Sequence, residues 1–197
     1  MASANLVADR ALPHPSAIRS VSGPTRLRQA DLLHITDRTA DDVLSGRFDH
    51  VVPPAGVPTN DRWFVRLNGD DEVDIWLISW VPGHRTELHD HGGSLGALTL
   101  LSGSLDEFRW DGQRLRRRRL EAGDQAAFPL GWVHDVLWAP GAAAPPGKPP
   151  AVPLPADPTL SVHAYSPPLT VMSYYEITDQ QTLRCKRTEL TDQPEKL

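Results

Sequence analysis

The stretch that decides the fold runs from Trp80 to Gly103 and reads WVPGHRTELHDHGGSLGALTLLSG. Near its centre, His89 and His91 stand two residues apart among residues that favour strands and turns. Side chains at positions i and i+2 of a strand point to the same face, so both imidazoles can reach one point. A neutral imidazole nitrogen binds a transition metal at about 2.0–2.1 Å. The pair therefore indicates half of a metal site, although two surface histidines would give the same three letters.

The glycines around this pair follow a regular spacing. Five residues separate Gly83 from His89, and one separates His89 from His91. Four residues then lead to Gly96, and six more precede Gly103. This spacing resembles the first motif of the cupin proteins, G(X)5HXH(X)3,4E(X)6G, with Gly96 in the place of the metal-binding glutamate.

A second motif follows further along the chain, in GDQAAFPLGWVHDVLW. Gly123 precedes Pro129 by five intervening residues, one residue separates Pro129 from Gly131, and two separate Gly131 from His134. This resembles the second cupin motif, G(X)5PXG(X)2H(X)3N, with Trp138 replacing the terminal asparagine. The two motifs together predict an all-β fold, the cupin double-stranded β-helix (a jelly-roll barrel), with short N-terminal helices.

Length and composition limit the remaining possibilities. The 197 residues fit one domain, and a formal net charge of −5 argues against a general nucleic-acid binder. Cys185 is the only cysteine, which excludes an intramolecular disulfide. The first residues lack the pattern of a secretory signal, and no run of about 18 apolar residues could span a membrane. We expect a cytoplasmic monomer with no membrane or nucleic-acid partner.

The chain divides into three parts by composition. We expect residues 1–25 to form a flexible arm, 26–178 to form the cupin domain, and 179–197 to form a polar tail. The domain begins with helical patterns, of which TADDVLSG is a second short helical turn that ends at Gly46. A Pro/Ala-rich insertion at about 139–160 cannot hold regular strand pairing, and we expect it on the surface near the site.

From residue 61 onward, short apolar runs alternate with glycine-containing turns, which suits a jelly roll and not a βαβ array. The basic run RLRRRRL lies between two such turns and is followed by acidic residues. We interpret it as a solvated edge strand, whose charges discourage pairing with another chain, and not as a nucleic-acid site.

Three histidines, His89, His91 and His134, are expected to converge inside the barrel. Three neutral nitrogens leave open positions of the kind used by non-haem Fe(II) oxygenases, which more often use two histidines and a carboxylate. Replacing the carboxylate by imidazole leaves the site one charge more positive, which favours an anionic ligand such as a thiolate. Zinc would also accept three histidines and a water, so the ligands alone leave the metal open.

Two further strands carry candidate polar groups. Ser161, His163 and Tyr165 alternate in SVHAY, share a face, and could form a relay that holds the tyrosine hydroxyl near the metal. Phe64 and Arg66 share a face of an earlier strand, where Arg66 could offer a planar fork to a carboxylate. A packed tyrosine and a surface arginine are the alternatives that remain open at these positions.

Beyond the cupin motifs, WVPGHRTELHDHGGSLGALTLLSGSL resembles the metal strand of the cysteine dioxygenase family, which are cupin-fold thiol dioxygenases. The resemblance covers about residues 60–175 and includes an arginine on an early strand, a histidine after a Gly-Pro turn, and SVHAYSPP near the end. It implies an Fe(II) enzyme that converts L-cysteine and O2 to cysteine sulfinic acid. The implied roles are iron ligation by His89, His91 and His134, carboxylate binding by Arg66 beside Phe64, and hydrogen bonding to the reacting groups by Tyr165, oriented by His163 and Ser161.

Departures from the family pattern bear on the substrate. Animal members carry a cysteine cross-linked to the tyrosine where this chain has Gly96, so the resemblance implies the bacterial type without a Cys–Tyr cross-link. Phe64 stands where the family usually has tyrosine. Relatives that act on 3-mercaptopropionate generally have glutamine in the place of Arg66, which favours cysteine here. A dioxygenase for another small thiol, such as 3-mercaptopropionate, and a non-catalytic metal-binding cupin sensor are the alternatives.

Overall fold

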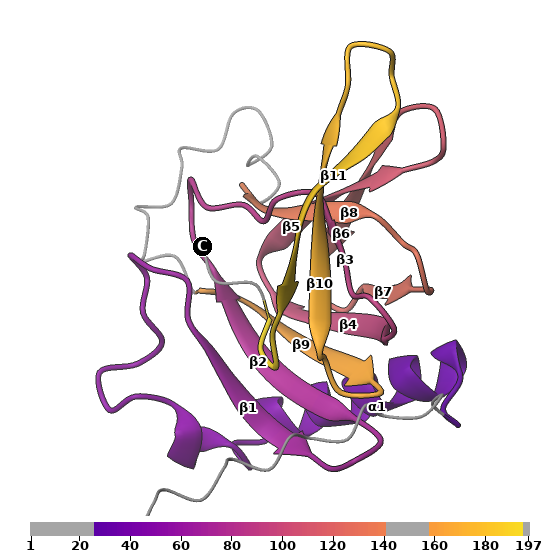
Figure 1. Cartoon of the computed structure of the whole chain (residues 1–197). Helices are drawn as coiled ribbons and strands as arrows, with labels where there is room; N and C mark the ends of the chain where they lie inside the picture. Colours follow the sequence, from indigo (N-terminus) through magenta and orange to yellow (C-terminus); the bar gives the residue numbers. More distant parts are fainter. Residues whose placement is uncertain (1–25, 141–157, 195–197) are drawn as a thin grey trace, which may run out of the picture.

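The computed structural model describes residues 26–140 and 158–194. In these residues two antiparallel sheets face each other, and one long helix lies against the outside of the five-stranded sheet (Figure 1). The five-stranded sheet has the order β1-β2-β9-β4-β7, and the six-stranded sheet has the order β11-β10-β3-β8-β5-β6. After β2 the chain passes repeatedly from one sheet to the other. This is the all-β double-stranded β-helix of the cupins, as the two motifs predict.

The elements have the following bounds. The five-stranded sheet contains β1 (Phe64–Gly69), β2 (Asp74–Trp80), β4 (Leu95–Ser102), β7 (Gln125–Phe128) and β9 (Thr159–Ser166). The six-stranded sheet contains β3 (His89–Asp90), β5 (Ser104–Trp110), β6 (Leu115–Glu121), β8 (His134–Ala139), β10 (Val171–Ile177) and β11 (Leu183–Leu190). Before the sheets come the helix α1 (Gln29–Leu44) and the 3-10 turn η1 (Asp49–Val51).

The strand β2, which lies between β1 and β9, is buried along its whole length because both of its faces are covered. Trp76, Ile78 and Trp80 belong to the cluster between the two sheets. Ile75 and Leu77 point the other way, into the cluster beneath α1. This explains why the sequence here is a continuous apolar run and not a polar–apolar alternation.

The neighbouring strand β9 obeys the same alternation, and this places its polar residues inside the barrel. Val162 and Ala164 pack in the cluster beneath α1. Successive side chains of a strand point to opposite faces, so Ser161, His163 and Tyr165 face the interior between the sheets. All three are at least 96% buried, with exposed fractions of 0%, 4% and 4%.

The sequence predicted two short helical pieces before the sheets, and this division is wrong. A single 16-residue helix, α1, runs through the point where a second turn was predicted to begin. Leu32, Thr36 and Ala40 form one buried stripe at helical spacing against the sheet. The Thr36 hydroxyl is satisfied there, because it accepts a hydrogen bond from Thr99 at 2.9 Å. The predicted stop at Gly46, which has φ +84°, lies just beyond the helix end.

The expectation of a polar tail from residue 179 onward is also wrong. β11 pairs with β10 along its length and forms one edge of the six-stranded sheet. Its side chains are mostly exposed, so its polar composition is that of an edge strand whose stability comes from backbone pairing. Beyond the strand, Pro194 is buried and returns to the interior pocket described below.

The predicted arm, 1–25, lies outside the described residues, and so does most of the predicted insertion. β8 continues to Ala139 and β9 already begins at Thr159, so the regular strands occupy both ends of the range predicted for the insertion. Within the described residues, no helix is long and apolar enough to cross a membrane.

The basic run lies on β6, at the other edge of the six-stranded sheet, as expected. Its arginines are engaged within the sheet: Arg117 pairs with Asp106 at 2.9 Å, and Arg116 pairs with Asp111. The positive charges of this edge are therefore partly neutralised by neighbouring carboxylates.

Candidate metal centre

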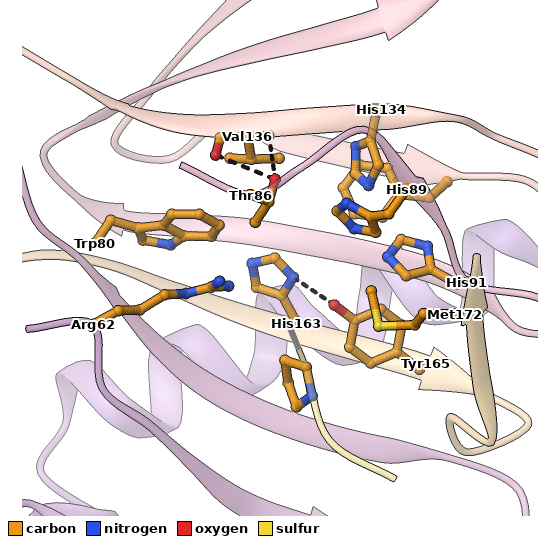
Figure 2. A pocket seen from close by; sticks show the side chains of 12 residues that line it. Arg62, Trp80, Thr86, His89, His91, His134, Val136, His163, Tyr165 and Met172 are labelled. Atoms are coloured by element: carbon orange, nitrogen blue, oxygen red, sulfur yellow. Dashed lines mark hydrogen bonds between the residues drawn. The ribbon is translucent and has the colours of Figure 1, made fainter. Parts of the chain in front are cut away.

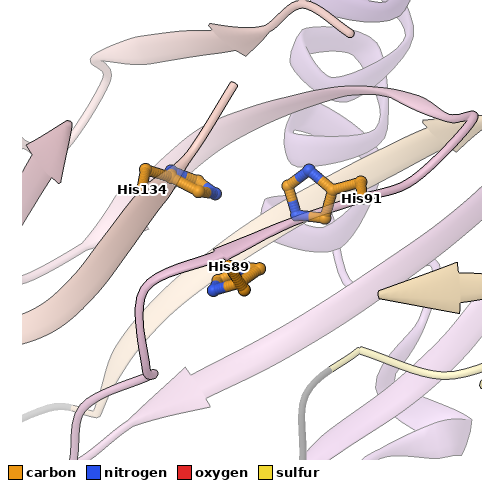
Figure 3. Close-up of side chains that lie close together, drawn as sticks. All are labelled: His89, His91 and His134. Atoms are coloured by element: carbon orange, nitrogen blue, oxygen red, sulfur yellow. The ribbon is translucent and has the colours of Figure 1, made fainter. Parts of the chain in front are cut away.

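The structure brings the three predicted histidines together. His89, His91 and His134 are buried, and each offers one ring nitrogen such that these atoms all lie within 4.8 Å of one another (Figure 3). Their ring centroids are separated by 5.1, 4.9 and 5.2 Å. A cluster of this size has the dimensions needed for three nitrogens to share one metal ion.

Strand register creates this convergence. On the short strand β3, His89 lies directly opposite His134 of β8, although 44 residues separate them in the sequence. His91 follows two residues later, at a turn in which Gly92 has φ +57°. A Cβ atom at Gly92 would lie 2.4 Å from Val171, so only glycine fits. The Asp90 carboxylate accepts the Gly92 N–H at 2.9 Å and stabilises the turn.

The hydrogen bonds of two rings determine which nitrogen faces the centre. The His89 Nδ1–H donates to the carbonyl oxygen of Glu87 at 2.7 Å, since a carbonyl can only accept. His134 Nδ1 lies 3.1 Å from the Glu107 carboxylate. Its Nε2 is buried and has no hydrogen-bond partner among the described residues. A buried unsatisfied nitrogen is costly, and a transition metal would satisfy it, so the residues fit a metal ion.

The surroundings of His89 and His91 lower the pKa values of both rings. Burial, followed by the positive potential of His134, lowers the pKa of His89 to about 3. Burial and the neighbouring His89 and His134 likewise hold the pKa of His91 well below its usual value. Both rings are therefore unprotonated at neutral pH, which is the form that binds metals.

The C-terminal hairpin supports the loop that carries His89. Arg187 of β11 donates two hydrogen bonds to the Glu87 carboxylate, at 2.6 and 3.1 Å, and Lys186 donates a third at 3.1 Å. These contacts lower the pKa of Glu87 to about 2. The Arg187 guanidinium also lies 3.8 Å from the Tyr174 ring centroid, and Tyr174 is paired with His89 across β10 and β3. The segment predicted as a polar tail thus supports the loop that carries His89.

A carboxylate supports His134 from behind. Glu107 of β5 is 3% exposed and accepts hydrogen bonds from Trp132 Nε1 at 3.0 Å and His134 Nδ1 at 3.1 Å, both on Oε1. Burial alone would raise the pKa of Glu107, but the His134 and Trp132 hydrogen bonds outweigh it and the net shift is downward. Arg109 covers the outer face of Trp132 at 4.3 Å from the ring centroid.

The opposite wall holds the predicted relay. His163 Nδ1 lies 3.2 Å from the Tyr165 hydroxyl (Figure 2). Its Nε2 lies 2.9 Å from Ser161 Oγ. Ser161 also accepts a hydrogen bond from Trp80 Nε1 at 2.8 Å, a contact that sequence reasoning did not anticipate. Burial, with the nearby Arg62, keeps the pKa of His163 well below its usual value. The relay therefore runs through a neutral imidazole.

Both walls line one pocket. The side of the six-stranded sheet contributes Thr86, His89, His91, His134, Val136 and Met172. The side of the five-stranded sheet contributes Arg62, Trp80, Phe128, His163 and Tyr165, and Pro194 completes the lining (Figure 2). The Tyr165 ring centroid lies 4.9 Å from that of His91, so the two walls meet at this pair.

The structure does not bring Arg66 and Phe64 to this pocket. The Arg66 guanidinium pairs with Asp74, whose side chain is 1% exposed. Phe64 packs edge-on against Trp76, with ring centroids 5.8 Å apart. Neither lines the pocket, so the placement of Arg66 on the cavity is wrong: a buried carboxylate further along the strand pair holds its charge.

The arginine that lines the pocket is Arg62, which sequence reasoning missed. Its guanidinium lies 4.3 Å from the Trp80 ring centroid. The signal was present, because Arg62, Phe64 and Arg66 follow one another at a spacing of two. That alternation indicates a shared face but not the depth along the barrel at which each side chain stands.

Comparison with known families supports part of this picture. The model of the family described as cysteine dioxygenase type I matches residues 55–128. The matched segment contains Arg62, His89 and His91 and ends before His134 and before β9. No curated protein sequence matches the chain.

Solved structures with similar folds include three bacterial proteins. A Klebsiella pneumoniae protein described as having a double-stranded β-helix domain is 19% identical, with 60% of this chain and 85% of that chain covered and a TM-score of 0.42. A cupin superfamily protein from Desulfitobacterium hafniense is 14% identical, with 56% and 81% covered and a TM-score of 0.42. A putative sugar phosphate isomerase from Acidithiobacillus ferrooxidans is 19% identical, with 66% and 76% covered and a TM-score of 0.44.

Proposed function

We propose that the protein is a mononuclear non-haem Fe(II) thiol dioxygenase that converts L-cysteine to cysteine sulfinic acid. The reaction adds both atoms of O2 to the thiol: RSH and O2 give RSO2H, so sulfur loses four electrons and O2 accepts them. The observation that carries the proposal is a three-histidine cluster facing the Ser161–His163–Tyr165 chain across one pocket. Iron, when bound by the histidines, would supply a positively charged, redox-active centre that attracts a thiolate and reacts with O2.

Arg62 takes the role of carboxylate binder in this proposal. A guanidinium presents several donors in a planar fork that matches a carboxylate, a geometry that a lysine does not offer. The Trp80 ring at 4.3 Å supports the guanidinium by a cation–π contact and limits its orientations. Thiol and carboxylate ends of a small substrate would then be bound at the histidines and at Arg62.

Tyr165 provides a hydrogen-bond donor at the reacting end. Trp80 Nε1 can only donate, so it occupies a lone pair of Ser161 Oγ. The Ser161 hydroxyl can then donate to His163 Nε2, and His163 Nδ1–H can donate to the Tyr165 oxygen. In this order every donor has an acceptor, and the phenol proton of Tyr165 points onward to a reacting oxygen or thiolate. A positioned donor of this kind stabilises developing negative charge.

Tyr165 acts in this proposal as an unmodified phenol. Gly96 has no side chain, and a Cβ atom there would lie 2.9 Å from the Phe128 ring and 3.4 Å from Tyr165. Cys185, the only cysteine, is exposed on β11. No thiol is therefore available beside Tyr165 for a thioether bond.

The decisive experiment mixes anaerobically iron-reconstituted protein with L-cysteine, admits O2, and follows oxygen uptake beside product mass. We expect one O2 consumed for each cysteine converted to a product two oxygen atoms heavier. Uptake with 3-mercaptopropionate but not with cysteine would replace the substrate and keep the reaction, because both molecules carry a thiol and a carboxylate. No uptake with either thiol would overturn the proposal.

A further inference from the structure

Among the described residues, the candidate metal-binding cluster consists of three histidines without a carboxylate, and a side chain at the motif position would have to displace the Phe128 ring. Gly96 takes the place of the motif glutamate, and a Cβ atom there would come within 2.9 Å of the Phe128 ring. Three neutral imidazoles therefore leave a bound divalent ion with its full positive charge in a buried site. Such a charge is costly unless a negative group lies nearby.

Glu107 is a buried carboxylate whose oxygen contacts a ring of this cluster, whereas the other buried carboxylate nearby, Asp135, is bonded to Arg85 and Thr86. On β5 it lies opposite Val136, and Arg109, two residues further along, lies opposite His134. The side chain is only 3% exposed. A glutamate is rarely buried to this extent unless it has a bonding partner. Its Oε1 lies 3.1 Å from His134 Nδ1, on the side of the ring away from the unpartnered Nε2.

We propose that Glu107 is a positioning residue that supplies, through the His134 ring, the negative charge that a direct carboxylate ligand would give. Its acceptor oxygen keeps the His134 proton on Nδ1, so the Nε2 lone pair faces the metal. The adjacent negative charge makes that nitrogen a stronger donor. This inference rests on the proposed metal site at the three histidines and adds the residue that sets its affinity and charge.

Trp132 provides an internal comparison, because its Nε1 donates to the same oxygen, Oε1, at 3.0 Å. Removing this second donor leaves the carboxylate and its charge in place for His134. Replacing the Glu107 carboxylate by an amide of the same shape removes the negative charge beside the His134 ring. The two changes disturb the same hydrogen-bonded group but have different consequences for a metal.

The test measures the dissociation constant of Co(II), used as an oxygen-stable probe, for the wild-type protein, Glu107→Gln and Trp132→Phe. We expect Glu107→Gln to weaken Co(II) binding by about 10–100-fold and to shift the Co(II) absorption bands. Trp132→Phe and the surface control Glu121→Gln, on the adjoining strand β6, should bind within about threefold of wild type. The thermal midpoint of each metal-depleted variant reports whether the fold is retained.

The outcomes separate this inference from the proposed function. A wild-type protein that binds no Co(II) would overturn the metal site itself. Wild-type binding with equal affinity in Glu107→Gln would overturn the role of Glu107 alone, as would equal losses in Glu107→Gln and Trp132→Phe. If Glu107→Gln does not fold, nuclear magnetic resonance of the Zn(II)-loaded wild type decides, because a His134 ring without a proton on Nδ1 would contradict the inference.

Discussion

The two walls of the pocket differ in how their polar side chains are hydrogen-bonded. On the wall formed by β3 and β8, His89 and His134 each direct Nδ1 to an oxygen acceptor, the Glu87 carbonyl and the Glu107 carboxylate. On the wall formed by β2 and β9, hydroxyl and imidazole groups form a chain from Trp80 to Tyr165. In the proposed function, the first wall sets the tautomers of two metal-binding histidines, and the second positions the Tyr165 hydroxyl for the substrate.

This division teaches that the three histidines can be supplied from the side of one sheet alone. The other sheet is then available for the ligand contacts that we propose, with Arg62 for a carboxylate and Tyr165 for the reacting end. Substitutions on one wall should therefore change metal affinity, and substitutions on the other should change turnover. The predictions below test that separation.

The largest effect is expected from His134→Ala. Removal of one of three ligands should weaken metal binding by more than about 100-fold, because even the groups that support such ligands contribute 10–100-fold. Metal content after dialysis and the Co(II) dissociation constant measure it. His50→Ala, in the exposed turn η1, is the matched control and should retain the metal. Full metal retention in His134→Ala would contradict the assignment of this wall.

Tyr165→Phe should lower kcat by about 100-fold, since a positioned proton donor contributes on the order of 100-fold or more. Metal affinity should stay at the wild-type value, because the hydroxyl lies on the opposite wall. Steady-state oxygen uptake and Co(II) titration of the same preparation separate the two quantities. A variant that loses metal and turnover together would show that the walls are not independent.

Arg62→Gln should raise KM for cysteine by about 30-fold or more, because truncating one partner of a buried charged contact costs about 2–5 kcal/mol. Arg66→Gln should leave KM unchanged and lower the stability, since it removes a charged partner of the buried Asp74. Cysteamine, which lacks the carboxylate, should be turned over equally by the wild type and Arg62→Gln. If KM for cysteine rose in Arg66→Gln and stayed unchanged in Arg62→Gln, Arg66 and not Arg62 would be the carboxylate binder.

The metal-depleted protein should lose stability as the pH falls from 6.5. The folded pKa of His89 is about 3, below the value near 6.5 of an unfolded histidine, and the pKa values of His91 and His163 are lowered as well. The unfolded state then binds more protons in this window, so the free energy of unfolding rises with pH up to about 6.5. Each imidazole contributes up to about 1.4 kcal/mol per pH unit.

Urea unfolding at pH 5, 6 and 7 measures this slope, and a slope of zero would contradict the buried neutral state of the histidines. Histidines of both walls contribute to this slope, and a substitution on one wall separates their contributions. His163→Phe removes one titrating ring from the relay wall and should reduce the slope by the share of one imidazole.

The smallest effect is expected from Trp80→Phe. An aromatic ring remains beneath Arg62, but the N–H that orients Ser161 is lost. A neutral hydrogen bond contributes about 0.5–1.5 kcal/mol, so kcat should fall by about 3–10-fold with little change in KM. A rise in KM without a change in kcat would place Trp80 with Arg62 and not with the relay.

Much of the fold and of the metal wall could be predicted from local spacing. The pattern HxH implies that His89 and His91 share a face, and SxHxY implies the same for Ser161, His163 and Tyr165. The glycines of the two motifs indicate the turns between strands. These features depend only on residues close in sequence, because in a strand the spacing of two residues determines whether their side chains point to the same face.

Other features lay beyond such reasoning because they depend on contacts between distant segments. The segment TADDVLSG suggested a second helical turn, but its first residue, Thr39, is buried against the sheet within a continuous α1. The polar sequence of β11 suggested a tail, but pairing with β10 makes it a strand. In both cases a tertiary partner satisfies the polar groups that would otherwise face water.

The sequence by itself determined the strand alternation, the two histidine motifs and the faces on which the polar residues stand. Only the tertiary structure decided that Arg62 and not Arg66 reaches the pocket, that Trp80 donates to Ser161, and that Glu107 stands behind His134. The reason is that alternation specifies a face with a period of two, whereas depth and cross-strand neighbours depend on register. Register between strands far apart in the chain is set by how the two sheets pack around their shared core.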